Sequence, residues 1–203
     1  TMPTIPQKCW NTLARLTRLE FLRLTTQTGV LGDFQYLPRS LRSILSNSSR
    51  IDRVHLLPPS LTSFQLFNGI WDLPKPLQDD LVFPASLTEL WLPLKLYSSQ
   101  MSCLKDLVNL KTLSIRVQTG EDYHPTQMMN VFSKLTKLSR LLLAVTEIID
   151  QQPEHTIKID RDLLELLPKS LVALTIEGPK TTIRDEDVTA LPPGLIYLKI
   201  PDS

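Results

Sequence analysis

The side chains best suited to catalysis or to metal binding are few in this sequence and lie far apart. The histidines are His55, His124 and His155, and none has a second histidine, a cysteine or a carboxylate at the spacing of a metal-ligand pair. Cys9 and Cys103 form no CxxC motif, so the sequence predicts neither a disulfide framework nor a zinc site. There is no Gly-x-Ser-x-Gly motif and no P-loop. We therefore expect a protein that is not an enzyme and that holds no metal and no cofactor.

Two further features could take part in chemistry, and each has a simpler structural interpretation. Cys103 could meet a histidine in space, but nothing near it in the sequence favours an activated thiolate, so we expect a buried cysteine or one in a connecting segment. Asp185, Glu186 and Asp187 could bind a cation. They precede an apolar pattern of helical spacing, however, and acidic residues are stabilised at the start of a helix. A solvated helix start is the prediction for this acidic run.

Composition and charge limit the partners and the location of the protein. A formal net charge of +1 and a hydrophobic fraction of 42% are typical of a soluble folded protein with no bulk attraction to nucleic acid or to anionic lipid. The longest apolar stretch, Leu141 to Val145, is far shorter than the roughly 20 residues that span a bilayer. We expect no nucleic-acid partner, no membrane span and a cytoplasmic location. Because the chain begins Thr1-Met2, we also expect it to be a piece of a longer protein.

The strongest pattern in the sequence is a repeat near its C-terminus. The apolar positions are Ile159, Leu164, Leu167, Leu171, Leu174 and Ile176 in the first copy, and Ile183, Val188, Leu191, Leu195, Leu198 and Ile200 in the second. Each position of the second copy follows its counterpart by 24 residues. A period of roughly 20 to 50 residues indicates a solenoid, in which each unit buries its apolar face against the next.

The same Leu-x-x-Leu-x-Leu pattern recurs along the chain about every two dozen residues. Aligned on its second leucine position, the anchors of about eight units are Leu22, Ile44, Phe64, Leu90, Leu113, Leu141, Leu174 and Leu198. The last two apolar residues of each pattern are two apart, so they point the same way from a short strand. We predict that these strands stack in parallel with their apolar side chains turned inward. The second unit is imperfect, because Ser46 takes the place of an apolar residue.

The segments between the strands differ in length, which predicts different structures for them. Pro125 and the acidic residues from Asp160 to Asp162 each precede an apolar run, so we expect helices to begin there. The shortest connections leave room only for a turn or a 3₁₀ segment. Residues 1–15 are predicted to form a helical cap or lead-in, since Cys9, Trp10, Leu13 and Leu16 recur at helical spacing. The repeats then occupy residues 16–203, with a surface loop from Asn68 to Asp80.

A Leu-Pro-x-Ser/Gly-Leu element precedes several of the strands. It begins at Leu37, Leu57, Leu167 and Leu191, and at the variant Phe83. With this element, the chain resembles the leucine-rich repeat superfamily over nearly its whole length and is similar to F-box/leucine-rich repeat and FNIP-type repeat proteins of lower eukaryotes. The resemblance implies an α/β solenoid in the form of an irregular horseshoe. It would have a parallel sheet on the concave face and mixed helices, 3₁₀ segments and loops on the convex face.

The outward residues of the strands are the candidate binding residues. Strands in such a stack lie about 4.8 Å apart, so outward side chains of neighbouring units touch. Grouped Trp and Arg residues have the composition of binding hot spots. The predicted partner-binding residues are Phe67, Glu89, Trp91, Arg116, Arg140 and Leu142. Alternatively, Trp91 packs on Pro93 or under a loop, and the long segment that follows Leu142 covers it.

The resemblance implies a non-enzymatic scaffold that binds a partner protein or peptide on the concave sheet face. Two alternatives stay open. The chain could be the substrate-recognition part of an F-box ubiquitin ligase receptor, with an F-box before Thr1, or a surface receptor or adhesin, for which Asn47-Ser48-Ser49 is a glycosylation sequon. No polar unit follows Ile200 to cover the last repeat, and solenoids need caps at both ends. We therefore expect further repeats, a cap or another chain, including a second copy of this one, to cover that end.

Overall fold

The computed structural model shows how the repeats are arranged. It describes residues 7–25, 30–31, 34–47, 50–51, 54–67, 81–96, 98–119, 125–147, 157–178 and 181–200. The loop predicted from Asn68 to Asp80 lies outside these residues, as do His124 and His155.

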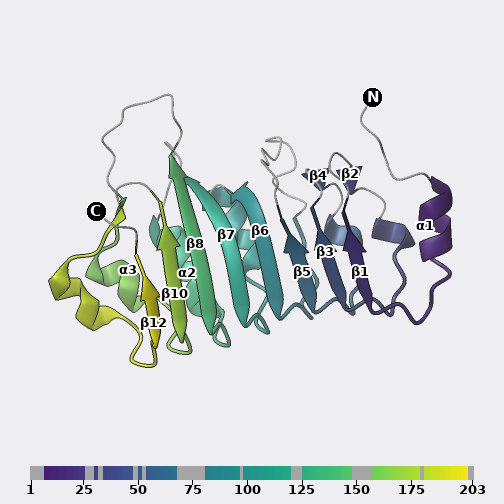
Figure 1. Ribbon diagram of the computed structural model, residues 1–203. Helices are drawn as coiled ribbons and strands as arrows, with labels where there is room; N and C mark the ends of the chain where they lie inside the picture. Colours follow the sequence, from purple (N-terminus) through teal and green to yellow (C-terminus); the bar gives the residue numbers. More distant parts are fainter. Residues whose placement is uncertain are drawn as a thin grey trace.

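Within this part of the chain, eight strands form one parallel sheet (Figure 1). They are β1 (Phe21–Leu24), β3 (Ser43–Ser46), β5 (Ser63–Leu66), β6 (Glu89–Leu96), β7 (Thr112–Thr119), β8 (Arg140–Glu147), β10 (Ala173–Glu177) and β12 (Tyr197–Lys199). Their order in the sheet follows their order in the chain. Each coil of the chain therefore adds one strand beside the previous one, which gives a solenoid-like fold of the α/β class.

The register of the sheet confirms the predicted stacking of the eight anchors. Leu22 pairs with Ile44, Ile44 with Phe64, and the row continues through every neighbouring pair to Leu198. The first seven anchors are buried, and Leu174 is only 1% exposed. Leu198, on the last strand, is 38% exposed. The apolar spacing in the sequence thus corresponds to one continuous row of core side chains.

A second inward row lies two residues further along the strands. It contains Ser46, Leu66, Leu92, Ile115, Leu143 and Ile176, all of them buried. Ser46 is fully buried in the place where the pattern has an apolar residue. A third row, formed by Leu96, Val117 and Val145, exists because β6, β7 and β8 are each eight residues long. The repeat pattern did not predict this third row.

The Leu-Pro-x-Ser-Leu element forms the turn into a strand. In each case the proline carbonyl accepts a hydrogen bond from the N–H of the leucine three residues later, as between Pro38 and Leu41 at 3.1 Å. Pro also fixes φ for the turn and needs no ladder partner for its nitrogen. The turn therefore explains why proline precedes the strand and does not lie within it.

The serine of this element links one coil to the coil before it. We call the four serines that make this bond the serine ladder. Their Oγ atoms donate to carbonyl oxygens of the preceding coil, Ser40 to Leu19 at 2.8 Å, Ser60 to Leu41 at 2.9 Å, Ser86 to Leu61 at 2.6 Å and Ser170 to Leu138 at 2.8 Å. In the last coil Gly194 takes the place of the serine, beside the carbonyl of Leu171.

The connections on the other side of the sheet follow the predicted lengths. The short ones contain the 3₁₀ helices η1 (Phe34–Tyr36) and η2 (Val54–Leu56) and the two-strand sheet of β2 (Val30–Leu31) with β4 (Arg50–Ile51). The longer ones contain η4 (Ser98–Leu104), α2 (Pro125–Lys134), α3 (Arg161–Glu165), η5 (Asp185–Ala190) and the pair of β9 (Ile157–Lys158) with β11 (Thr181–Thr182). Figure 1 shows α2 behind the sheet.

The predicted helix starts are confirmed for α2 and α3. Helix α2 begins at Pro125, where the missing N–H of proline costs no hydrogen bond. Helix α3 is capped by Asp160, whose carboxylate accepts from the N–H of Leu163 at 3.1 Å.

The third predicted helix start, at Asp185, is partly wrong. Its helix, η5, is of the 3₁₀ type. A 3₁₀ helix has about three residues per turn instead of 3.6, which changes the side that faces inward. As a result Asp187 is buried, at 7% exposed, whereas Val188, predicted as an inward repeat position, is 44% exposed.

The two ends of the sheet differ. Helix α1 (Gln7–Leu13) lies beyond β1 (Figure 1). Its Trp10 is buried in the core at 2% exposed. The predicted N-terminal helix and its apolar positions Trp10 and Leu13 are confirmed, since both side chains pack on the core. Cys9 and Leu16 are exposed, so these two positions of the predicted face are wrong, and Leu16 lies beyond the end of the helix at Leu13. At the other end, every residue of β12 is exposed.

Candidate functional site

Groups suited to catalysis do not gather in the part of the chain that the structure describes. Among the described residues, no group of three or more His, Cys, Asp or Glu side chains could hold a metal ion. Cys103 packs against the core from η4, and burial raises the pKa of its thiol from 9.0 to about 12. A thiol with so high a pKa is a poor nucleophile at neutral pH.

No helix within the described part of the chain is both long enough and apolar enough to span a bilayer.

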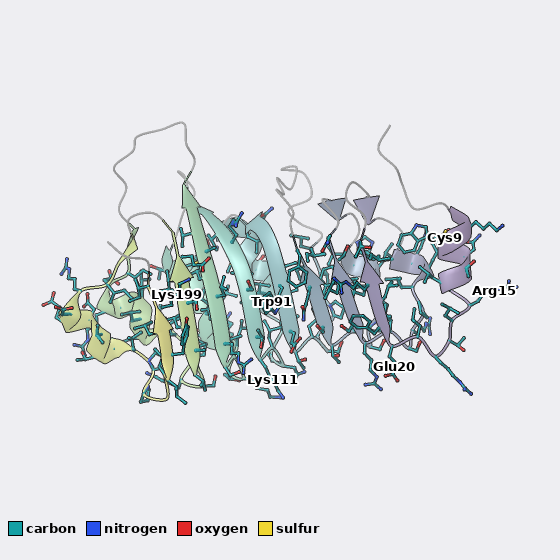
Figure 2. The ribbon with its side chains drawn as sticks, in the orientation of Figure 1. Cys9, Arg15, Glu20, Trp91, Lys111 and Lys199 are labelled. Carbon is teal, nitrogen blue, oxygen red and sulfur yellow. The ribbon has the colours of Figure 1, made fainter. Side chains whose placement is uncertain are left out.

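The face of the sheet opposite the buried rows is the candidate site, and we call it the open face. Its first row consists of Phe21, Ser43, Ser63, Glu89, Thr112, Arg140, Ala173 and Tyr197. Its second row consists of Arg23, Leu45, Gln65, Trp91, Ser114, Leu142, Thr175 and Lys199. All of these side chains are exposed or half-buried. Figure 2 shows Trp91 near the middle of the sheet and Lys199 towards its C-terminal end.

Trp91 and Phe67 form the aromatic centre of the open face. Their ring centroids lie 6.0 Å apart at an interplanar angle of 45°. Phe67 directly follows β5, and its N–H donates to the carbonyl of Ser46 at 2.8 Å, which holds the backbone beside the neighbouring strand. Both rings are half-buried. The alternative contact of Trp91 with Pro93 involves a side chain outside the described residues.

Glu89 is held by polar neighbours on β5. Its Oε2 accepts from the hydroxyl of Ser63 at 3.1 Å and from Nε2 of Gln65 at 3.0 Å. Gln65 Nε2 also lies 3.2 Å from the Ser63 hydroxyl. The predicted set contained Glu89 but neither Ser63 nor Gln65. The two-residue period of a strand places all three outward, but only the register of β5 with β6 shows that they meet.

Arg116 lies on β7 beyond the second row, and its position differs from the prediction. Counted from the anchors Leu90 and Leu113, Pro93 and Arg116 occupy the same position of their repeats and would share a row, but the register shifts between Leu92 and Lys95, and Arg116 pairs with Lys95. Pro93 has no N–H to donate to a ladder, so a bulge at this point is the natural accommodation. Arg116 lies two residues further along β7 than Ser114, which pairs with Trp91.

Arg140 and Leu142 lie on β8, in the first and second rows. Arg140 pairs with Thr112 and Ala173 and is exposed. Leu142 lies between Ser114 and Thr175 and is half-buried. The alternative in which the segment after β8 covers Leu142 involves residues outside the described ranges. The structure thus places the six predicted residues on or directly beside three neighbouring strands, β6 to β8, and the end of β5.

At the C-terminal edge of the open face, Lys199 Nζ lies 3.3 Å from Glu177 Oε1. No protein-family model matches this chain, and no curated protein matches its sequence. The functional proposal therefore depends on the residues of the open face.

Proposed function

We propose that the chain is a leucine-rich repeat protein that acts as a non-enzymatic interaction scaffold and binds a partner protein or peptide on its open face. The observation that carries the proposal is the Trp91 and Phe67 pair at the centre of this face. Tryptophan and arginine are the residues most enriched at binding hot spots, and Arg116 and Arg140 lie on the two strands that follow β6.

The apolar character of the open face supports the proposal. Parallel sheets are normally covered on both faces. Here the connections cover one face, while Leu45, Phe67, Trp91 and Leu142 remain half-buried on the other. Half-buried apolar side chains of this kind gain stability when a partner removes them from water.

The open face also has a suitable size. Eight parallel strands spaced by about 4.8 Å give a width of about 34 Å, and strands of three to eight residues give a height of about 10 to 26 Å. One partner of a standard protein interface contributes about 800 Å², which is comparable with this area.

Paired variants test the proposal. The full chain with Trp91→Ala and Phe67→Ala would be compared with wild type and with Val108→Ala, which removes an exposed apolar side chain elsewhere. Proteins captured by the wild type would be identified, purified and titrated by calorimetry. We expect the double variant to bind at least about 30-fold more weakly, since hot-spot truncations cost about 2 kcal/mol or more. Equal affinity of the double variant, with an unchanged circular dichroism spectrum, would contradict the proposal.

A further inference from the structure

The contacts of the open face leave two cations without a carboxylate partner among the described residues. Glu89 keeps its negative charge but accepts hydrogen bonds from the neutral side chains of Ser63 and Gln65, and Glu177 is paired with Lys199. Arg116 and Arg140 make no ion pair with any residue that the structure describes. Their guanidinium groups are therefore available to an acidic partner.

The two arginines are spaced along the strands in a regular way. Thr112 pairs with Arg140, so Arg116 lies four residues further along than the level of Arg140, on the neighbouring strand. Four residues of strand span about 13 Å, and adjacent strands are about 4.8 Å apart. Between the two levels lies the second row, where Trp91, Ser114 and Leu142 are neighbours. Along the strand direction, the cation Arg140 is therefore followed by the row of Trp91 and Leu142 and then by the cation Arg116.

We propose, resting on the function proposed above, that the partner contributes an extended acidic segment with carboxylates at positions i and i+4 and an apolar side chain at i+2. In an extended chain these three side chains point the same way, and the outer two are about 13 Å apart. The carboxylates then meet Arg140 and Arg116, while the apolar side chain lies on Leu142 and Trp91. Guanidinium groups bind carboxylates through paired, charge-assisted hydrogen bonds. A basic segment in the same place would be repelled.

Selection of peptides by the full chain tests this directly. A phage-displayed library of random 12-residue peptides would be selected on the wild type, on Arg116→Gln/Arg140→Gln and on Trp91→Ala. The control is Arg15→Gln/Arg18→Gln, which removes the same charge from exposed arginines that are not on the open face. Selected peptides would be labelled, and their affinities for all four proteins measured by fluorescence anisotropy, with circular dichroism to verify each fold.

We expect enrichment of Asp or Glu at i and i+4 around an apolar residue at i+2. The double arginine variant should bind these peptides at least about ten-fold more weakly, the product of about three-fold for each exposed ion pair. The control should bind like the wild type, and raising the salt concentration should weaken binding. Peptides that need Trp91 but show no acidic enrichment, and that ignore both arginines, would overturn the inference and leave the proposed function intact. Selected peptides that bind Trp91→Ala as tightly as wild type would overturn both.

Discussion

The first three coils and the middle three coils use the same anchor row but build different structures around it. Strands β1, β3 and β5 have four residues each, and 3₁₀ helices connect them. Strands β6, β7 and β8 have eight residues each and gain the third inward row. The longer coils therefore bury more apolar surface and also present a taller open face. Trp91, Arg116, Arg140 and Leu142 all lie on these longer strands.

The cores of the two regions differ as well. In the first region Phe34 packs edge-on against Phe64 with centroids 6.3 Å apart, and Phe64 lies 6.5 Å from Phe83. In the middle region the inward rows are aliphatic, with Met128 and Phe132 from α2 among the buried residues behind them. Bulky aromatic side chains fill a short coil where fewer residues are available. The N-terminal region therefore compensates for fewer inward rows with larger side chains.

The largest predicted difference between two parts of the molecule is in the rate at which its two cysteines react. Cys9 is exposed on α1, whereas Cys103 is desolvated in η4 with a pKa of about 12. At pH 8 only about one Cys103 thiol in 10⁴ is ionised. A thiol-reactive dye should label Cys9 quickly and Cys103 at least about a thousand-fold more slowly until urea unfolds the chain. Labelling of Cys9→Ser at the wild-type rate would contradict this.

The same pKa predicts a pH dependence of stability. The pKa of Cys103 is raised on folding, so its contribution is fully present below the ordinary value of 9.0. Between pH 9 and about pH 12 the thiol of the unfolded chain ionises while the folded thiol stays neutral. The free energy of unfolding should fall over this range, and Cys103→Ala should reduce the fall. Urea titrations at several pH values would measure both.

Truncation of an anchor side chain should lower the free energy of unfolding most in the middle of the sheet. Leu113 is fully buried between Leu90 and Leu141, so Leu113→Ala should lower the free energy of unfolding by about 2 to 5 kcal/mol. Leu198→Ala removes a side chain that has a partner strand on one side and should cost about 1 kcal/mol or less. Urea titrations of both variants compare the two positions. A similar loss for both would mean that the last coil is as well covered as the middle.

Removal of one hydroxyl of the serine ladder should lower the free energy of unfolding by less than truncation of a central anchor. Ser86 links the first region to the middle one, because its Oγ donates to Leu61 at 2.6 Å and lies 2.7 Å from the Pro59 carbonyl. Ser86→Ala should lower stability by about 1 kcal/mol. Ser133→Ala, which removes an exposed hydroxyl bonded within α2, is the matched control. Equal stability of the two variants would show that the ladder bond adds nothing.

The smallest expected effect is a gain in stability from a substitution in the last coil. A Cβ added at Gly194 would lie 3.9 Å from the Leu171 carbonyl, an ordinary van der Waals distance. Gly194→Ser would therefore fit and could place its hydroxyl as the other ladder serines do. We expect a gain of about 0.5 to 1 kcal/mol in thermal or urea unfolding, and Gly194→Ala should give less. Destabilisation by serine but not by alanine would show that the hydroxyl finds no acceptor.

The sequence was informative wherever one coil determines its own structure. The anchors, the proline turns, the starts of α2 and α3, and the short 3₁₀ connections all follow from patterns local to a coil. Other features depend on how neighbouring coils meet. The shift after Leu92 and the bonds of Glu89 to Ser63 and Gln65 depend on register and on contacts between coils. A single period in the sequence carries no information about those contacts.

Inward and outward side chains alternate along the strands of the open face. Different residues therefore determine the packing of the core and the composition of the exposed surface. A substitution at Ser114 or Thr175 changes the surface offered to a partner, while Leu113 and Leu174 behind it keep their neighbours. Under the function proposed above, single substitutions in the outward rows would change binding preference at a small cost in stability.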